Sequence, residues 1–242
     1  MKLIGVGVGP GDPDLVTVKA VRVLTEADVV LVPVLAAGEP GRAEATVRAH
    51  VSHGRIRRVA FAFASDERNA RQRREAAWEA AATAVIEAFA AGAEVVAFAT
   101  LGDPNIYSTF TYLAQSVTER LVGAEVSTVP GITALQDLAA RSGTVLCEGR
   151  ETLALLPLTA GVARFADALA TFDTVVGYKS GSHLPEALAA VRKAGRLGDA
   201  VYGAALGLAD EDIRPAAEVS GPAPYLSTLL VAGRRTVRGG KL

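Results

Sequence analysis

The chain has 242 residues, of which 50% are hydrophobic and 21% are charged, so it can bury a substantial core, and wholesale disorder is excluded. Its 25 Lys and Arg residues and 26 Asp and Glu residues leave a formal net charge of -1, without the strong basic excess of a general nucleic-acid-binding protein. A single cysteine, Cys147, excludes an intramolecular disulfide framework and a metal site built from several cysteines.

Strands and helices alternate in the first half of the chain. Apolar runs predict strands at 3–8 and 29–32, and helical spacing starts between them at Leu15, so these segments form a βαβ unit with parallel strands. Farther along, the same patterns predict helices at 69–91 and 106–121 and strands at 94–100 and 126–129.

The second half of the chain differs from the first, because its predicted helices and strands are shorter. They are a helix at 133–141, strands at 153–158, 174–178, 200–206 and 225–231, and a helix with Ser182 as its N-cap that ends at Gly195. Because the pattern of predicted elements changes at 127–131, we expect a domain boundary there. The predicted fold class is α/β, with an amino-terminal α/β lobe at 1–126 and a carboxy-terminal α/β lobe at 127–242.

Neither a membrane span nor a signal peptide is expected. The longest apolar stretch, at 29–37, contains Pro33 and is far shorter than the roughly 20 residues that cross a bilayer. Glycines and Asp12 interrupt the amino-terminal apolar residues before a signal-peptide core forms. The sequence therefore predicts a soluble, cytoplasmic protein.

A glycine-rich turn follows the first strand and contains Gly5, Gly7, Gly9 and Gly11. It does not match the dinucleotide-binding spacing, because Pro10 or Asp12 occupies the position of the third glycine. Proline offers no N–H to a pyrophosphate, and an aspartate repels one. A tight turn from strand to helix explains the glycines but not the prolines that flank them, so a nicotinamide or flavin site is not expected.

Two more turns close predicted strands, Leu101-Gly102-Asp103-Pro104 and the segment VPGIT at 129–133. The carboxyl ends of strands are where open α/β sheets bind ligands. Asp103 could accept hydrogen bonds from a ligand, or it could cap a helix with Pro104 at the first position, and the local sequence fits both interpretations. The second turn of the same kind favours a ligand site where several strand ends converge.

Catalytic side chains are not identified by the sequence. His50 and His53 have no carboxylate or thiol nearby at ligand spacing, so surface histidines and no metal site are expected. No serine lies in a nucleophile-elbow motif. The arginines between Arg55 and Arg74 alternate with acidic residues, which favours a solvated helix face over a patch that binds polycarboxylates.

The segment Val6-Gly7-Val8-Gly9-Pro10-Gly11-Asp12-Pro13, followed by Leu15, Thr17 and Lys19, resembles the opening of the tetrapyrrole (corrin/porphyrin) methylase family. The GDP segment, the VPGI-T segment and the closing strand recur in family order, so the resemblance covers essentially the whole chain. Within the family, GDPNIYSTFTYL at 102–113 and PYLSTL at 224–229 are similar to the branch that methylates C20 of precorrin-2.

The resemblance implies two α/β lobes with S-adenosyl-L-methionine (SAM) in the cleft between them, usually in a homodimer. Carried over by motif, the cofactor-binding residues are Pro10, Leu101, Gly102, Asp103, Ile106, Thr133, Ala134, Tyr178 and Ala205. At Tyr178 the branch commonly has a methionine that packs near the cofactor, so the contact of this residue is open.

The implied activity is SAM-dependent C-methylation of precorrin-2 at C20, which gives precorrin-3A in cobalamin biosynthesis. A cobalt-precorrin-2 enzyme of the anaerobic route and a methylase for another ring position are the alternatives. A nucleotide-binding module or an inactive SAM-binding regulator represents a different class. Because the reduced tetrapyrrole is itself a carbon nucleophile, the enzyme mainly has to align two reactants and exclude water. Although a solvated helix face is the favoured interpretation of the arginine segment, we hypothesise that one or more of Arg57, Arg58 and Arg71 faces the cleft and binds substrate carboxylates.

Overall fold

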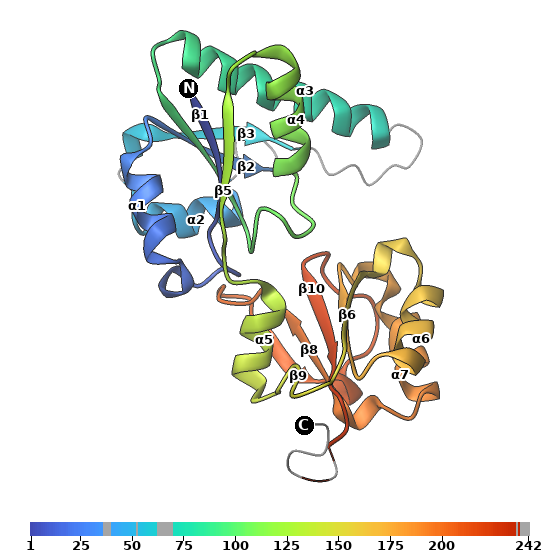
Figure 1. Cartoon of the computed structure of the whole chain (residues 1–242). Helices are drawn as coiled ribbons and strands as arrows, with labels where there is room; N and C mark the ends of the chain where they lie inside the picture. Colours follow the sequence, from blue (N-terminus) through green and yellow to red (C-terminus); the bar gives the residue numbers. More distant parts are fainter. Residues whose placement is uncertain (36–39, 52, 62–69, 236, 238–242) are drawn as a thin grey trace. The chain divides into compact units, whose positions relative to one another are not determined.

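The computed structural model describes residues 1–35, 40–51, 53–61, 70–235 and 237. The chain forms two compact units, Met1–Thr133 and Ala134–Leu242, and each has its own five-stranded sheet (Figure 1). Both units combine helices with a sheet, so the predicted α/β class is confirmed. No described helix is both long enough and apolar enough to cross a membrane.

The first unit is a parallel sheet with helices on both faces. Its strands follow the order β3-β2-β4-β1-β5 and all pair in parallel. The strands are β1 (Lys2–Gly7), β2 (Val29–Val34), β3 (Ile56–Ala60), β4 (Val95–Thr100) and β5 (Glu125–Val129). The helices are α1 (Val18–Glu26), α2 (Arg42–Arg48), α3 (Ala70–Ala90) and α4 (Phe110–Arg120).

Side chains of the central strands alternate between two cores. Leu3 and Phe98 pack with α3 and α4 on one face, whereas Val6 and Ala97 pack with α1 and α2 on the other. A strand buried on both faces reads as a continuous apolar run, which is why β2 and β4 are visible in the sequence. This burial fixes the register of the sheet and therefore where its strands end.

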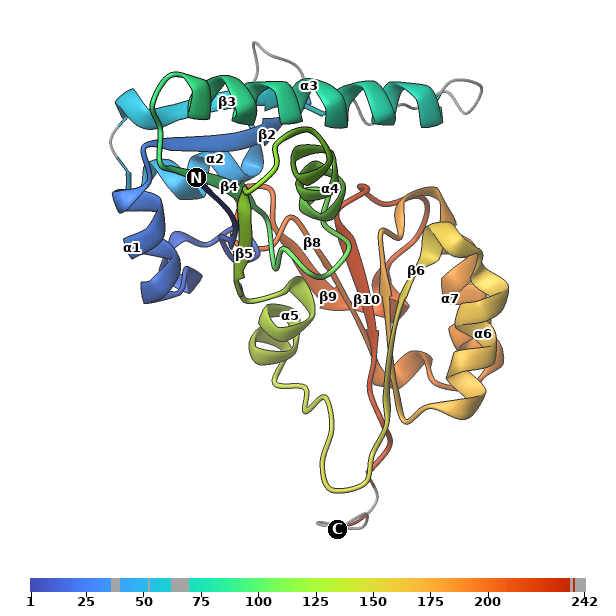
Figure 2. The same ribbon diagram turned by 45° about the horizontal axis from the view of Figure 1, so that its top comes forward.

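The second unit has a mixed sheet in the order β6-β7-β10-β8-β9. β6 pairs in parallel with β7, and β10 lies antiparallel between β7 and β8. Its strands are β6 (Leu153–Pro157), β7 (Thr174–Tyr178), β8 (Ala200–Ala204), β9 (Asp212–Pro215) and β10 (Ser227–Val231). Helix α5 (Ala134–Ser142) covers one face, and α6 (Val162–Thr171) and α7 (Leu184–Lys193) cover the other (Figure 2).

The expected boundary after residue 126 falls inside β5. This strand pairs with β1 along Glu125–Val129, so the division lies later, after Thr133. The helix expected from 106 begins at Phe110, because Tyr107 has a left-handed φ of 50° that a right-handed helix does not continue. Ser182 is not an N-cap: it lies in a 3-10 turn, and His183 precedes α7 instead.

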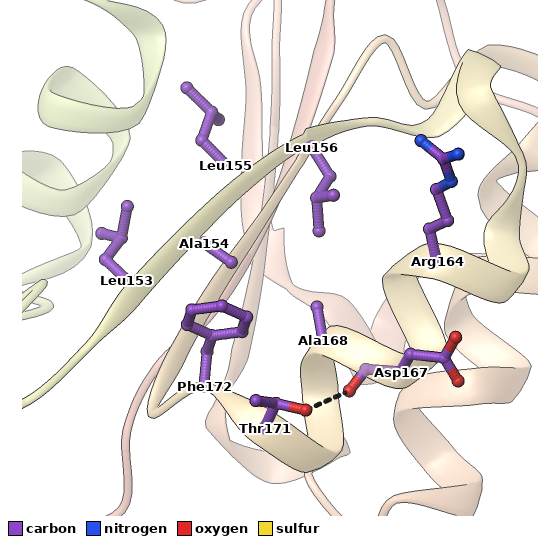
Figure 3. A pocket seen from close by; sticks show the side chains of 9 residues that line it. All are labelled: Leu153, Ala154, Leu155, Leu156, Arg164, Asp167, Ala168, Thr171 and Phe172. Atoms are coloured by element: carbon purple, nitrogen blue, oxygen red, sulfur yellow. Dashed lines mark hydrogen bonds between the residues drawn. The ribbon is translucent and has the colours of Figure 1, made fainter.

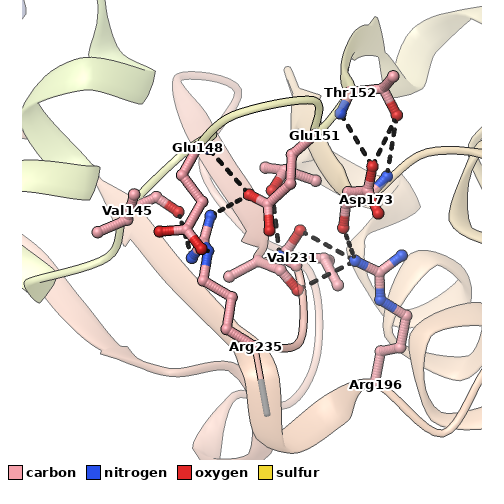
Figure 4. A network of polar contacts seen from close by, with 11 residues as sticks. Val145, Glu148, Glu151, Thr152, Asp173, Arg196, Val231 and Arg235 are labelled. Carbon is pink, nitrogen blue, oxygen red and sulfur yellow. Dashed lines mark hydrogen bonds and ion pairs between the residues drawn. The ribbon is translucent and has the colours of Figure 1, made fainter. Parts of the chain in front are cut away.

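Within the second unit, a polar network surrounds Arg235 and Arg196 (Figure 4). The Arg235 guanidinium binds the carboxylates of Glu148 and Glu151, and it holds the pKa of Glu151 below its usual value. The Arg196 guanidinium donates to backbone carbonyls, among them Leu169 O at 2.9 Å and Ala232 O at 3.0 Å. These contacts satisfy carbonyls at the end of α6 and after β10, a structural role.

Candidate functional site

Three turns meet at the carboxyl edge of the first sheet. They follow β4, β1 and β5, which are neighbours in the sheet. The turns after β1 and β4 are joined by hydrogen bonds from Val8 N to Thr100 O at 2.9 Å and from Gly102 N to Gly9 O at 2.7 Å. The structure thus brings the Gly9-Pro10 turn against Leu101, Gly102 and Asp103, as expected for a site at converging strand ends.

Glycines allow the three backbones to touch. A Cβ atom on Gly131 would lie 2.1 Å from Gly102 O, and one on Gly7 would lie 2.5 Å from the same oxygen. Gly102 itself has a left-handed φ of 67°, and a Cβ there would meet only Thr133 Cα, at 3.9 Å. Gly131 was not among the predicted site residues, although the Pro-Gly pair that closes β5 is a signal for such a close approach.

The Asp103 carboxylate locks two of these turns together. Its Oδ2 accepts a hydrogen bond from Gly131 N at 3.0 Å, and its Oδ1 accepts one from Asn105 N at 2.8 Å. Only 9% of the residue is exposed. The helix-cap interpretation is wrong, because α4 begins seven residues later with Thr109 before it. The segment between carries Ile106 and Tyr107, both partly exposed.

The expected residues of the second unit also lie at strand ends. Tyr178 ends β7, and its hydroxyl accepts a hydrogen bond from Leu135 N at 2.8 Å, in the first turn of α5. This bond brings Tyr178 next to the helix that starts at Ala134. β7 and β8 are both antiparallel to β10, so they run in the same direction, and Tyr178 and Ala205 share one edge of the sheet.

Backbone strain concentrates at these strand ends. Among the residues that the structure describes, the non-glycine residues with positive φ are Tyr107 at 50°, Lys179 at 58° and Ala205 at 50°. Each follows the carboxyl end of a strand: β4, β7 and β8 respectively. Such residues cost about 1–3 kcal/mol each and cluster at functional sites, so they mark the same edges as the motifs do.

Two of the three arginines proposed to bind the substrate, Arg58 and Arg71, form ion pairs within the first unit. Arg58 donates from Nε to Glu44 Oε2 at 2.7 Å, and the Glu44 side chain is completely buried. Arg71 donates to Glu75 at 2.8 Å on the exposed side of α3. Arg57 is exposed on β3, and Arg68 lies outside the described residues.

A groove of about 350 Å³ lies elsewhere, between strand β6 and helix α6 (Figure 3). Its floor is apolar, and the side chains of Arg164 and Asp167 project from α6 beside it. The lining residues are Leu153, Ala154, Leu155, Leu156, Arg164, Asp167, Ala168, Thr171 and Phe172. None of them was predicted as a site residue, and none belongs to the strand-end turns.

Residues 2–219 match the model of the Tetrapyrrole (Corrin/Porphyrin) Methylases. The chain is 34% identical over 238 residues to the precorrin-2 C(20)-methyltransferase of Sinorhizobium sp, covering 96% of this chain and 95% of the relative. It is 33% identical over 235 residues to the cobalt-precorrin-2 C(20)-methyltransferase of Salmonella typhimurium, covering 95% of each.

Solved structures share the fold. A cobalt precorrin-4 methyltransferase aligns with a TM-score of 0.68 at 20% identity, covering 96% of this chain and 94% of that one. The uroporphyrin-III C-methyltransferase of Thermus thermophilus, solved in complex with S-adenosylhomocysteine, aligns with a TM-score of 0.63 at 22% identity, covering 95% and 97%.

Proposed function

Because the chain belongs to the tetrapyrrole (corrin/porphyrin) methylase family, we propose that it methylates precorrin-2 at C20, with SAM as the methyl donor, to give precorrin-3A in cobalamin biosynthesis. The observation that carries this proposal is the pair of relatives with C20-methyltransferase names, which align over nearly the whole chain at 33–34% identity. One name specifies precorrin-2 and the other cobalt-precorrin-2. Metal-free precorrin-2 is our first choice, and cobalt-precorrin-2 is the alternative.

The residues at the strand ends fit a SAM-type ligand. Glycine at 102 leaves the space beside Thr133 Cα without a side chain, and the neighbouring turns offer backbone N–H and C=O groups for polar contacts. We propose that Pro10, Leu101, Gly102, Asp103, Ile106, Thr133, Ala134, Tyr178 and Ala205 hold it. When bound, SAM supplies a methyl group on a positively charged sulfur.

The chain's own contribution is alignment and exclusion of water. Asp103 keeps the turns after β4 and β5 at one fixed separation, so the backbone groups of the binding surface are preorganised. The hydrogen bond from Leu135 N to the Tyr178 hydroxyl likewise fixes the start of α5 relative to the end of β7. A carbon nucleophile in the substrate makes a nucleophilic side chain unnecessary.

The test is transfer of a radiolabelled methyl group from SAM to anaerobically prepared precorrin-2, followed by mass spectrometry and NMR to locate the new carbon at C20. A parallel reaction with cobalt-precorrin-2 separates the two substrate forms. Methylation at another ring position would contradict the C20 assignment. SAM binding without any transfer would favour a SAM-binding regulator over an enzyme.

We also propose that the enzyme is a cytoplasmic homodimer that associates through strand β6. This strand is the edge of its sheet and pairs with β7 on one side only, within the described residues. The apolar end strand of a sheet is a template for another strand. Arg164 and Asp167 beside it carry opposite charges, so we propose that Arg164 of one copy pairs with Asp167 of the other in a two-fold contact.

A further inference from the structure

A tetrapyrrole substrate needs local positive charge, and two of the three candidate arginines already form ion pairs. Precorrin-2 has carboxylate side chains around its rim, whereas the protein has a net charge of -1, so capture depends on local positive charge. Arg58 and Arg71 are held by Glu44 and Glu75. This inference rests on the proposed function and concerns where its substrate is held.

Lys179 stands at the edge that holds the predicted cofactor residues of the second unit. It directly follows Tyr178 at the end of β7, and its φ of 58° is unfavourable for a residue with a side chain. Its Nζ lies 5.6 Å from the centre of the Tyr225 ring, within the range of a cation–π contact. The cation–π contact therefore places this ammonium group beside the Tyr225 ring.

Tyr225 belongs to the segment PYLSTL, which resembles one branch of the family and contains none of the predicted cofactor-binding residues. Its loop is fastened to both strained strand ends, by Ala205 N to Leu226 O at 3.4 Å and by Ser180 N to Ser227 O at 3.5 Å. The loop is also closed on itself by Ser227 Oγ, which donates to Pro224 O at 2.6 Å.

This fastening leaves two large apolar side chains in solvent. Tyr225 is 47% exposed and Leu226 is 42% exposed. Large exposed apolar groups beside a charge mark ligand contacts when a scaffold holds them in place. A tetrapyrrole presents complementary chemistry, since it combines apolar ring surface with a rim of carboxylates.

We propose that Lys179, Tyr225 and Leu226 form a tetrapyrrole subsite, in which the Lys179 ammonium binds a rim carboxylate and the two apolar side chains contact the ring. The subsite adjoins Tyr178 and Ala205, so it holds the substrate next to the residues expected to hold the methyl donor. Lys179 thereby acts as a substrate-binding residue that orients the ring without contacting the reacting atoms.

The test compares Lys179→Gln, which removes the charge, with Lys179→Arg, which keeps it. Binding of anaerobic precorrin-2 is followed by its absorption spectrum, and binding of S-adenosylhomocysteine by calorimetry. For Lys179→Gln we expect the precorrin-2 Kd to rise about five- to tenfold, as for loss of a partly exposed charged hydrogen bond. Lys179→Arg should stay within about twofold of wild type, and the S-adenosylhomocysteine Kd should not change in either variant.

Lys193→Gln is the matched control, because Lys193 is an exposed lysine at the end of α7. It should leave both dissociation constants unchanged. The salt dependence of precorrin-2 binding should be shallower in Lys179→Gln than in wild type. Tyr225→Ala should also weaken precorrin-2 binding, with S-adenosylhomocysteine binding intact.

Three results overturn the subsite. The first is precorrin-2 binding by Lys179→Gln with the wild-type Kd. The second is a loss of precorrin-2 affinity in Lys179→Arg as large as that in Lys179→Gln. The third is a rise in the S-adenosylhomocysteine Kd in place of the precorrin-2 Kd. The last result assigns Lys179 to the carboxylate of the methyl donor. Because these are binding measurements, they are distinct from failure of the proposed function, which appears as absence of methyl transfer by the wild-type enzyme.

Discussion

Asp103 and Asp28 hold backbone amides at opposite ends of β4. Asp28 Oδ2 accepts hydrogen bonds from Glu94 N and Val95 N, each at 2.9 Å, at the amino end of the strand. These two bonds hold the pKa of Asp28 below its usual value. Asp103 joins Asn105 and Gly131 beyond the carboxyl end. Comparing a variant of each aspartate therefore distinguishes the loss of a structural carboxylate from damage to the candidate site.

We expect Asp103→Ala to weaken S-adenosylhomocysteine binding about ten- to over a hundredfold, the equivalent of about 1.5–3 kcal/mol for charge-assisted hydrogen bonds. The turns after β4 and β5 lose their link in this variant. Calorimetry measures the dissociation constant, and circular dichroism confirms that the fold persists.

Asp28→Ala is the control. We expect it to lower the stability of the protein and to leave its affinity for S-adenosylhomocysteine unchanged. Equal loss of affinity in both variants would show that the effect is a general loosening of the sheet. Unchanged affinity in Asp103→Ala would leave this carboxylate with a purely structural role.

At the scale of elements, the three strand-end turns depend on glycine at their contacts. Gly131→Ala should destabilise the protein by about 3 kcal/mol, since its Cβ would lie 2.1 Å from the Gly102 carbonyl oxygen. Urea unfolding measures the loss, and ligand affinity should fall with it. Gly198→Ala is the matched substitution: Gly198 has no positive φ, and nothing lies within 4 Å of its Cβ position.

Gly198→Ala should be neutral or stabilise by about 0.4–1 kcal/mol, because alanine lowers the entropy of the unfolded chain. A Gly131→Ala variant as stable as wild type would show that the turns have room to separate. It would also remove the argument that their close packing shapes the site.

Helix α2 is anchored to β3 by one buried carboxylate. Glu44 accepts from Arg58 Nε at 2.7 Å and from Arg48 Nε at 2.7 Å, and its side chain is fully buried. The bond from Arg58 lowers the pKa of Glu44, and Arg48 adds to the effect. We expect Glu44→Gln to destabilise by about 2–3 kcal/mol, less than a fully buried pair, because both arginines are one-third exposed.

The stability that Glu44→Gln loses depends on pH, and the direction follows from the lowered pKa of Glu44. Since the folded-state pKa of Glu44 lies below the ordinary value of 4.5, its stabilisation is complete above pH 4.5 and disappears as the pH falls through the folded-state pKa. The difference in unfolding free energy between wild type and Glu44→Gln should therefore be full at neutral pH and shrink below pH 4.5. Urea titrations at several pH values measure it, and a difference that grows on acidification contradicts the assignment.

For the whole molecule, the proposed dimer predicts a mass of two chains by light scattering. Leu153 lies half-exposed at the start of β6, so Leu153→Lys places a charge on the edge that pairs and should shift the mass to that of one chain. Val122→Lys, at a residue that is 93% exposed in the first unit, should remain dimeric. A wild-type protein with the mass of one chain rejects the dimer.

The regular elements that the sequence predicts are those whose burial leaves a periodic pattern. β4, β7 and α3 start and end within a residue or so of the predicted ranges, since strands buried on both faces and a long alanine-rich helix produce unbroken signals. The sequence also placed the Gly-rich, GDP and VPGI turns at strand ends. It missed β3, an edge strand with Arg57 and Arg58 exposed, and the short elements α2, α6 and β9.

Tertiary structure alone decided which distant groups meet. Asp103 joins Gly131 across 28 positions, Tyr178 joins Leu135 across 43, and Arg58 joins Glu44 across 14. Periodicity reports whether a side chain is buried, but not which partner its polar atoms find. That choice follows from strand order and register, because the carboxyl ends of parallel neighbours share one edge however far apart they lie in the chain.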